Sequence, residues 1–287
     1  MDSSLAKALA SRFASELLER ESVVHFEIST RACLFGPTTK GARKAISDLC
    51  SRLRNLFIDY AVYDKASILR VCTVNTKTVE ATGSAADAAL SLETIDVDPK
   101  KQLIRKLGVR VCFSRHSLQR LIQRLPLTIP QDATHLDYTL AIECLRDANV
   151  WCQTVLNAMR VAKVLGQKES NVNLIIPTRH GAFAGLFSED MTVVHIRSFL
   201  GPLQLGARES VWEKCRAIML DTGMDLNWVS NTNFKDPKVI AAFVLAEEAG
   251  VFSISWNRTN TSKDAPISLT GATESLSRFV PTALLQH

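Results

Sequence analysis

The sequence predicts an α+β fold in which amphipathic helices pack on a small, mostly antiparallel sheet, with flanking helical regions. Three observations lead to this prediction. Apolar side chains recur at helical spacing over residues 4–21 and 42–64. Short runs at 172–178, 181–188 and 192–200 carry the apolar and β-branched residues of strands. The 287 residues, 46% hydrophobic and 22% charged, can build one large domain or two small ones.

The first part of the chain predicts an N-terminal α/β module over residues 1–102. Leucine and phenylalanine recur at helical spacing near the start, whereas VVHFEIS alternates like a strand. Residues 80–102 favour weak order with one short alanine-rich helix, which places the end of the module at residue 102. The expected elements are helices at 4–21 and 42–64 and strands at 23–29 and 67–79.

The central part predicts a helix-plus-meander module over residues 103–205. Ser114 is a suitable N-cap for a short helix that Pro126 ends. The turn-forming SED at 188–190 predicts an antiparallel hairpin between the last two strands. The expected elements are strands at 108–114, 172–178, 181–188 and 192–200, and helices at 114–125 and 134–166, the latter broken near Asn149.

A C-terminal helical region with a loose tail is expected over residues 206–287. Helical spacing covers 207–223, which Gly223 closes. A second helix is expected at 236–250, with Pro237 near its start and Gly250 just past its end. The polar residues that follow predict a loose tail.

Composition limits the classes of function. The net charge of +5 and the isoelectric point near 8.8 permit an anionic partner, with RNA expected and DNA compatible with the same charge. Seven cysteines without a CxxC pair predict reduced thiols and a cytoplasmic location. The N-terminus lacks the apolar region of a secretory signal, and no window has the length of a membrane span. No cofactor motif or zinc-type spacing occurs, so neither a cofactor nor a metal is expected.

The segment CFSRHSLQRLIQRLP places His116, Arg120 and Arg124 four residues apart, opposite the leucine face of the expected helix. The helix dipole disfavours a charged imidazole in the first turn, so His116 could act as a base. The forked guanidinium groups of the two arginines could hold a phosphate. An ordinary solvated helix face has the same composition, and the pattern leaves both interpretations open.

Two later segments add candidate residues. The strand TVVHIRSFL places His195 and Arg197 on one face and Ser198 on the other. The segment IPTRHG supplies Arg179 and His180 at the end of the preceding strand. If these groups converge, the site would contain two histidines, a serine hydroxyl and several phosphate-binding arginines.

The segment SRHSLQRLIQR resembles the HAxxRxxxR helix of the RelE/barnase-like group of small metal-independent ribonuclease toxins. VNLIIPTRHGAFAGLFSEDMTVVHIRSFL resembles the meander that follows in that group, so the resemblance covers about residues 110–200. It implies that His116 corresponds to the helix histidine and that Arg120 and Arg124 correspond to phosphate-binding arginines. Ser198 falls near the hydroxyl residue of the last strand, whereas Arg197 has no firm counterpart.

The resulting hypothesis is a metal-independent endoribonuclease or toxin-like RNA-processing protein. His116 or His195 would take the proton of a ribose 2′-OH, Ser198 would lie near the reacting groups, and arginines would stabilise the transition state. The phosphate-binding set would be Arg120, Arg124, Arg179 and Arg197. The alternative is a non-catalytic module of a phage or mobile element that binds nucleic acid or protein through the same basic face. A protein partner or a homo-oligomer fits either hypothesis.

Overall fold

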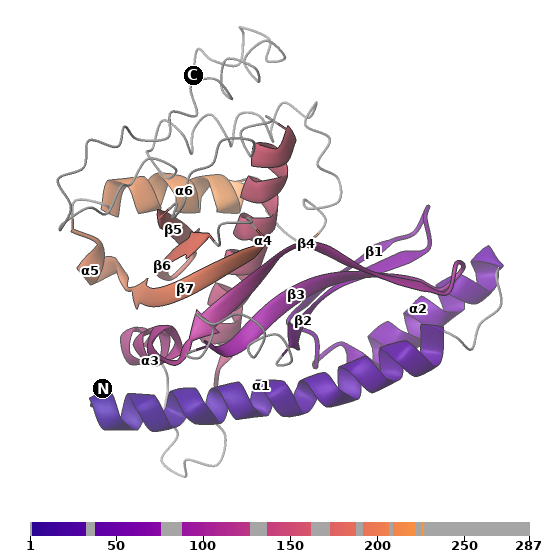
Figure 1. Ribbon diagram of the computed structural model, residues 1–287, viewed down its shortest axis with the longest axis horizontal. Coiled ribbons are helices and arrows are strands. Elements are labelled where there is room, and N and C mark those ends of the chain that lie inside the picture. Colours follow the sequence, from indigo (N-terminus) through magenta and orange to yellow (C-terminus); the bar gives the residue numbers. More distant parts are fainter. Residues whose placement is uncertain are drawn as a thin grey trace, which may run out of the picture.

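The computed structural model describes residues 2–32, 38–75, 88–126, 137–161, 173–187, 192–206, 209–221 and 226. Figure 1 shows a curled sheet with helices on both of its faces. The helices are α1 (Ser3–Ala32), α2 (Thr39–Leu53), α3 (Arg115–Arg124), α4 (Thr139–Val161), α5 (Pro202–Leu205) and α6 (Glu209–Asp221). The strands are β1 (Asp59–Tyr63), β2 (Ile68–Asn75), β3 (Ala88–Asp98), β4 (Leu103–Ser114), β5 (Asn173–Thr178), β6 (Gly181–Phe187) and β7 (Val193–Leu200).

All seven strands belong to one sheet in the order β1-β2-β3-β4-β7-β6-β5. β4 and β7 are parallel, and the other neighbours are antiparallel. The fold is therefore α+β as predicted, and most strand pairs are antiparallel, but the prediction of a small sheet is wrong, because all seven strands form one large mixed sheet. The parallel β4–β7 pair joins the N-terminal hairpins to the C-terminal meander, and only tertiary packing creates that pair.

The predicted strand at 23–29 is wrong, because this segment continues α1. The segment VVHFEIS satisfies two periods at once. Val24, Phe26 and Ile28 alternate as in a strand, while Val24 and Ile28 are also one helical turn apart. The helix buries Val24 and Ile28 and leaves Phe26 exposed.

Two other N-terminal predictions need correction. The helix expected at 42–64 ends at Leu53, and Asp59–Tyr63 forms β1 on the edge of the sheet. Part of the segment expected to be weakly ordered forms β3, which is buried between β2 and β4. The boundary predicted after residue 102 falls in the β3–β4 connection, where Lys101 and Gln102 precede β4. Serine and acidic residues within β3 hide its strand pattern in the sequence. Most of their hydrogen-bond and ion-pair partners lie far away in the sequence, so the local pattern gives no sign that these polar residues can be buried.

Most of the described central and C-terminal elements match those predicted from the sequence. The meander strands β5, β6 and β7 are confirmed, and β6 pairs antiparallel with β7. α4 runs through Asn149 without the expected break, because the buried Asn149 amide donates to Thr94 Oγ1 at 3.0 Å. α6 confirms the helix expected at 207–223, whereas the helix expected at 236–250 and the tail lie outside the described residues.

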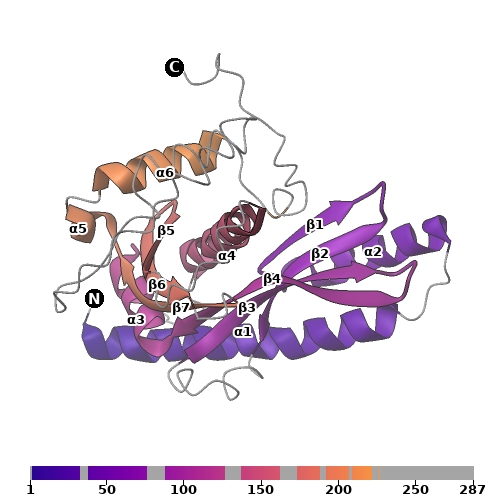
Figure 2. The same cartoon turned by 45° about the horizontal axis from the view of Figure 1, so that its top comes forward.

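Different helices cover the two faces of the curled sheet. We call the face that packs on α3 and α4 the inner face, and Figure 2 shows α4 lying between the two edge strands of the curl. The other face, the outer face, packs on α2 and the C-terminal half of α1 at one end and on α5 and α6 at the other. Side chains of the inner face include Val111, Phe113, Val194, Ile196 and Phe199.

The cysteines within the described side chains are free thiols, at positions 50, 72, 112, 144 and 152. Burial raises the pKa of Cys112 to about 11 and that of Cys144 to about 12. These thiols are therefore protonated at neutral pH and act as small apolar groups in the core. None of the helices in the described ranges is both long and apolar enough to cross a membrane.

Glu93 is a nearly buried carboxylate on β3, with a side chain 8% exposed. Lys106 Nζ lies 3.0 Å from one of its oxygens, and an Arg110 nitrogen lies 2.6 Å from the other. Burial raises the pKa of Glu93, but hydrogen bonds from Asn75 and Lys106 and the charge of Arg110 outweigh it. The pKa in the folded protein is therefore lower than the ordinary value of 4.5.

We expect acid to destabilise the protein partly through Glu93. Because its folded pKa is lowered, Glu93 stabilises the fold above pH 4.5 and loses this contribution as the pH falls through the folded pKa. Urea midpoints measured between pH 7 and pH 3 should fall less steeply for Glu93→Gln than for wild type. Glu209→Gln, at an exposed position on α6, is the control. Parallel pH profiles for wild type and Glu93→Gln would contradict this expectation.

Candidate functional site

The short helix α3 forms as the sequence predicts. The Ser114 hydroxyl accepts a hydrogen bond from the Ser117 backbone N–H at 3.0 Å, which caps the helix. Leu118, Leu121 and Ile122 are fully buried in the same core as Ile196 and Phe199 of β7. This packing confirms the predicted leucine face and directs the opposite side of α3 to solvent.

The solvent side of α3 carries His116, Arg120 and Arg124. His116 is exposed, and the two arginines are half-buried. Arg120 Nε donates to His116 Nε2 at 3.5 Å, and Arg120 Nη1 donates to Gln123 Oε1 at 2.8 Å. The Arg120 contacts hold its guanidinium along the helix surface, beside the His116 imidazole.

Arg124 connects α3 to the end of β7. Its Nη1 donates to the Phe199 carbonyl, and its Cβ lies against Gly201. Burial lowers the pKa of Arg124, and the charge of Arg120 lowers it further. Because the two guanidinium groups carry like charges, an anion bound between them would be stabilised.

The cations of α3 lack carboxylate partners among the described residues, as do other exposed cations such as Lys40 and Lys44 on α2. Over the described ranges, no carboxylate oxygen lies within 4 Å of His116, Arg120 or Arg124. By contrast, Arg70 pairs with Asp96 at 2.6 Å and Arg110 pairs with Glu93. Positive charge on α3 is therefore not neutralised within the described part of the protein.

A β-bulge at Arg197 changes the predicted faces of β7. Ser198 pairs with Ala184, and Ile196 pairs with Gly185, so Arg197 is an extra residue on β7. Beyond the bulge the alternation is reversed, which places Phe199 on the inner face and Ser198 on the outer face with His195. The prediction that His195 and Ser198 lie on opposite faces is therefore wrong.

The sheet separates two groups of predicted site residues. α3 packs on the inner face, whereas the alternation along β7 places His195 and Ser198 on the outer face. Arg197 is exposed at the bulge, and its carbonyl accepts a hydrogen bond from the Ser114 hydroxyl at 3.3 Å. Of the three candidate site residues on β7, His195, Arg197 and Ser198, Arg197 is therefore the one that lies beside the start of α3.

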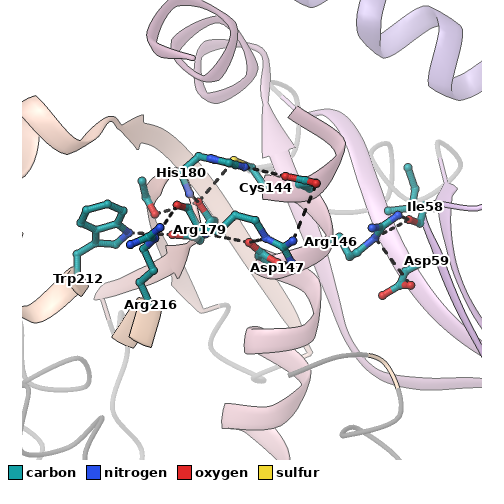
Figure 3. Close-up of polar contacts among 12 residues, drawn as sticks. Ile58, Asp59, Cys144, Arg146, Asp147, Arg179, His180, Trp212 and Arg216 are labelled. Atoms are coloured by element: carbon teal, nitrogen blue, oxygen red, sulfur yellow. Dashed lines mark hydrogen bonds and ion pairs between the residues drawn. The ribbon is translucent and has the colours of Figure 1, made fainter. Parts of the chain in front are cut away.

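Arg179 lies in a different polar cluster, in the turn between β5 and β6 (Figure 3). Its Nε and Nη2 donate to the two carboxylate oxygens of Asp147 at 3.0 and 2.8 Å. The Asp147 hydrogen bond raises the pKa of Arg179. This bidentate pair holds the guanidinium against α4, so the structure does not bring Arg179 to the arginines of α3.

The cluster around Arg179 contains His180, which the sequence singled out, and Glu143, Asp147 and Arg216, which it did not. Glu143 Oε2 lies 2.7 Å from His180 Nε2, and Arg216 Nε donates to the Arg179 carbonyl at 3.1 Å. The Trp212 indole donates to the Thr178 carbonyl at 2.8 Å. The signal in the sequence is the four-residue spacing of Glu143 and Asp147, which puts two carboxylates on one face of α4.

This cluster has a structural role, because α4 connects both edges of the sheet. The Arg146 guanidinium donates to the Ile58 carbonyl, which precedes β1, while Asp147 holds the turn after β5. Figure 3 shows these contacts on opposite sides of α4. We therefore regard α3, with Arg197 beside it, as the candidate functional site.

Among the described residues, no three His, Cys, Asp or Glu side chains gather closely enough to hold a metal ion. The chain matches no protein-family model, no curated protein and no solved structure.

Proposed function

We propose that this protein binds RNA through the solvent side of α3. The observation that carries the proposal is the set of charges on this helix that lack carboxylate partners among the described residues: Arg120 and Arg124, with His116 one turn before them. Arginine forks fit phosphate oxygens, and successive helical turns suit successive phosphates along a backbone. The net charge of +5 adds a long-range attraction for a polyanion.

RNA cleavage without a metal is the second candidate function. It is favoured by the position of His116 Nε2, 3.5 Å from Arg120 Nε, because this contact places an imidazole nitrogen beside a guanidinium that could hold the phosphate. Such a nitrogen could take the proton of a ribose 2′-OH while the arginines hold the adjacent phosphate. Because the sheet lies between α3 and the side chains of His195 and Ser198, these two residues would take no part in this step. The leaving oxygen would take its proton from water or from the imidazolium of His116.

The free thiols of the described cysteines support a cytoplasmic location for this activity. DNA presents the same phosphates as RNA. The binding measurement should therefore compare RNA with DNA of the same sequence.

Binding and cleavage can be separated with one substitution. We expect His116→Ala to abolish cleavage of a labelled single-stranded RNA in chelator, while changing the RNA Kd by less than about tenfold. The reason is that the imidazole would act on the reacting proton, whereas the arginines would supply most of the binding. Fluorescence anisotropy measures binding, and gel electrophoresis measures cleavage.

His25→Ala is the matched control, because His25 is also exposed on a helix but lies on α1. If wild type binds RNA but does not cut it, the cleavage proposal is refuted and only the binding proposal stands. Wild type that neither binds nor cuts RNA would refute the proposed function.

A further inference from the structure

The side of α1 that faces away from the sheet carries a stripe of exposed residues over most of the helix. At about 100° per residue, this stripe lies opposite the buried Phe13, Leu17 and Ile28. Figures 1 and 2 both show α1 along one margin of the molecule. We call it the α1 outer stripe, and its residues, all exposed, are Leu5, Ala8, Arg12, Ser15, Glu19, Val23 and Phe26.

The α1 outer stripe is apolar at both ends of the helix. Leu5 is 46% exposed near the N-terminus, and Val23 and Phe26 are 48% and 68% exposed near the C-terminus. About two thirds of the Phe26 surface is in contact with water, so its burial adds little to the stability of a monomer. Small residues, Ala8 and Ser15, lie between the apolar ends and allow another helix to approach closely.

The middle of the stripe carries one basic residue, Arg12, and one acidic residue, Glu19. Arg12 is 45% exposed and pairs with Glu16 one turn later at 2.8 Å. Glu19 is exposed two turns after Arg12, and no hydrogen bond or ion pair within the described residues engages its carboxylate. The positions of Arg12 and Glu19 are symmetric about the middle of the stripe.

From this pattern we propose that the α1 outer stripe binds the same stripe of a second copy of this chain, in antiparallel orientation. If the two-fold axis passes between Ser15 and Glu16, Leu5 faces Phe26 of the partner subunit. Arg12 likewise faces Glu19 of the partner subunit. Each contact occurs twice, as an isologous two-fold interface requires. A parallel pair would instead bring like charges together, so the charges select the antiparallel arrangement.

The size of the stripe sets the expected strength of the dimer. A helix of this length spans roughly 45 Å, and a helix is about 10 Å wide. Its footprint of roughly 450 Å² per subunit is below the roughly 800 Å² of a standard interface. The dimer is therefore weak and reversible, and it dissociates on dilution.

Sedimentation velocity of the full chain from about 1 µM to about 500 µM tests the proposal. We expect wild type to shift from monomer to dimer over this range. Phe26→Glu should raise the dimer Kd by at least about tenfold, because the substitution acts twice in each dimer. Leu203→Glu is the control, since Leu203 is 94% exposed but lies on α5. Circular dichroism should show unchanged helix content in both variants, because both positions are exposed.

Charge reversal gives a sharper test of orientation. Arg12→Glu alone would place two carboxylates against each other at both of the charged contacts, and Glu19→Arg alone would place two guanidinium groups there. Each single variant should therefore be monomeric. An equimolar mixture of the two variants should recover the dimer, because every charged contact then joins opposite signs. Wild type that stays monomeric throughout, a Phe26→Glu variant that dimerises like wild type, or a mixture without recovery would each overturn the proposal.

Discussion

Replacing Arg120 and Arg124 together by alanine is expected to weaken RNA binding about 100-fold. A hydrogen bond to a charged group contributes about 1.5–3 kcal/mol, so each lost phosphate contact costs roughly a factor of ten or more. The slope of log K against log salt should also flatten by about 1.4 for single-stranded RNA, because two fewer counterions are released. Fluorescence anisotropy at several salt concentrations measures both quantities.

Lys40→Ala with Lys44→Ala is the matched control for this pair. The two lysines are exposed, are four residues apart on α2 and carry the same total charge as the two arginines. If general positive charge drives binding, both double variants will weaken it equally, and the site on α3 is refuted. Arg124 also donates to the Phe199 carbonyl, so the thermal midpoint of the arginine variant should be measured beside its Kd.

Replacing Asp147 by alanine is expected to give the largest loss of stability. Its side chain is only 2% exposed and accepts hydrogen bonds from the Arg179 backbone N–H, Nε and Nη2. Removing one partner of a buried ion pair costs about 3–5 kcal/mol. Arg179 is 35% exposed, so water recovers part of this cost, and we expect a loss of about 2–4 kcal/mol. Urea unfolding measures this difference directly.

Asp48→Ala is the control for the Asp147 substitution. Asp48 also lies within a helix, but no ion pair or side-chain hydrogen bond within the described residues engages its carboxylate. Alanine is a better helix former, so this variant should unfold at the same urea concentration as wild type or slightly above it. Equal midpoints for Asp147→Ala and wild type would show that α4 does not need this ion pair to hold the β5–β6 turn.

Local pattern was sufficient to predict α3 and the meander. Ser114 caps α3, and its leucines share one face at helical spacing, so neighbouring residues alone determine which side of this helix reaches solvent. The short SED turn between the runs that form β6 and β7 likewise predicted their antiparallel pairing. These features depend on interactions within a few residues, which a single sequence displays directly.

Features that depend on distant residues were decided by the tertiary structure. VVHFEIS fits both a strand and a helix, and the core that receives Val24 and Ile28 selected the helix. The bulge at Arg197 arises where β7 must match β6, and it moves Ser198 to the face of His195. Arg179 carries the same chemistry as Arg120, yet its position beside Asp147 on α4 gives it a partner. The sequence by itself determined which side chains could bind a phosphate, and packing determined which of them are already engaged, because ion pairs form between elements that only the fold brings together.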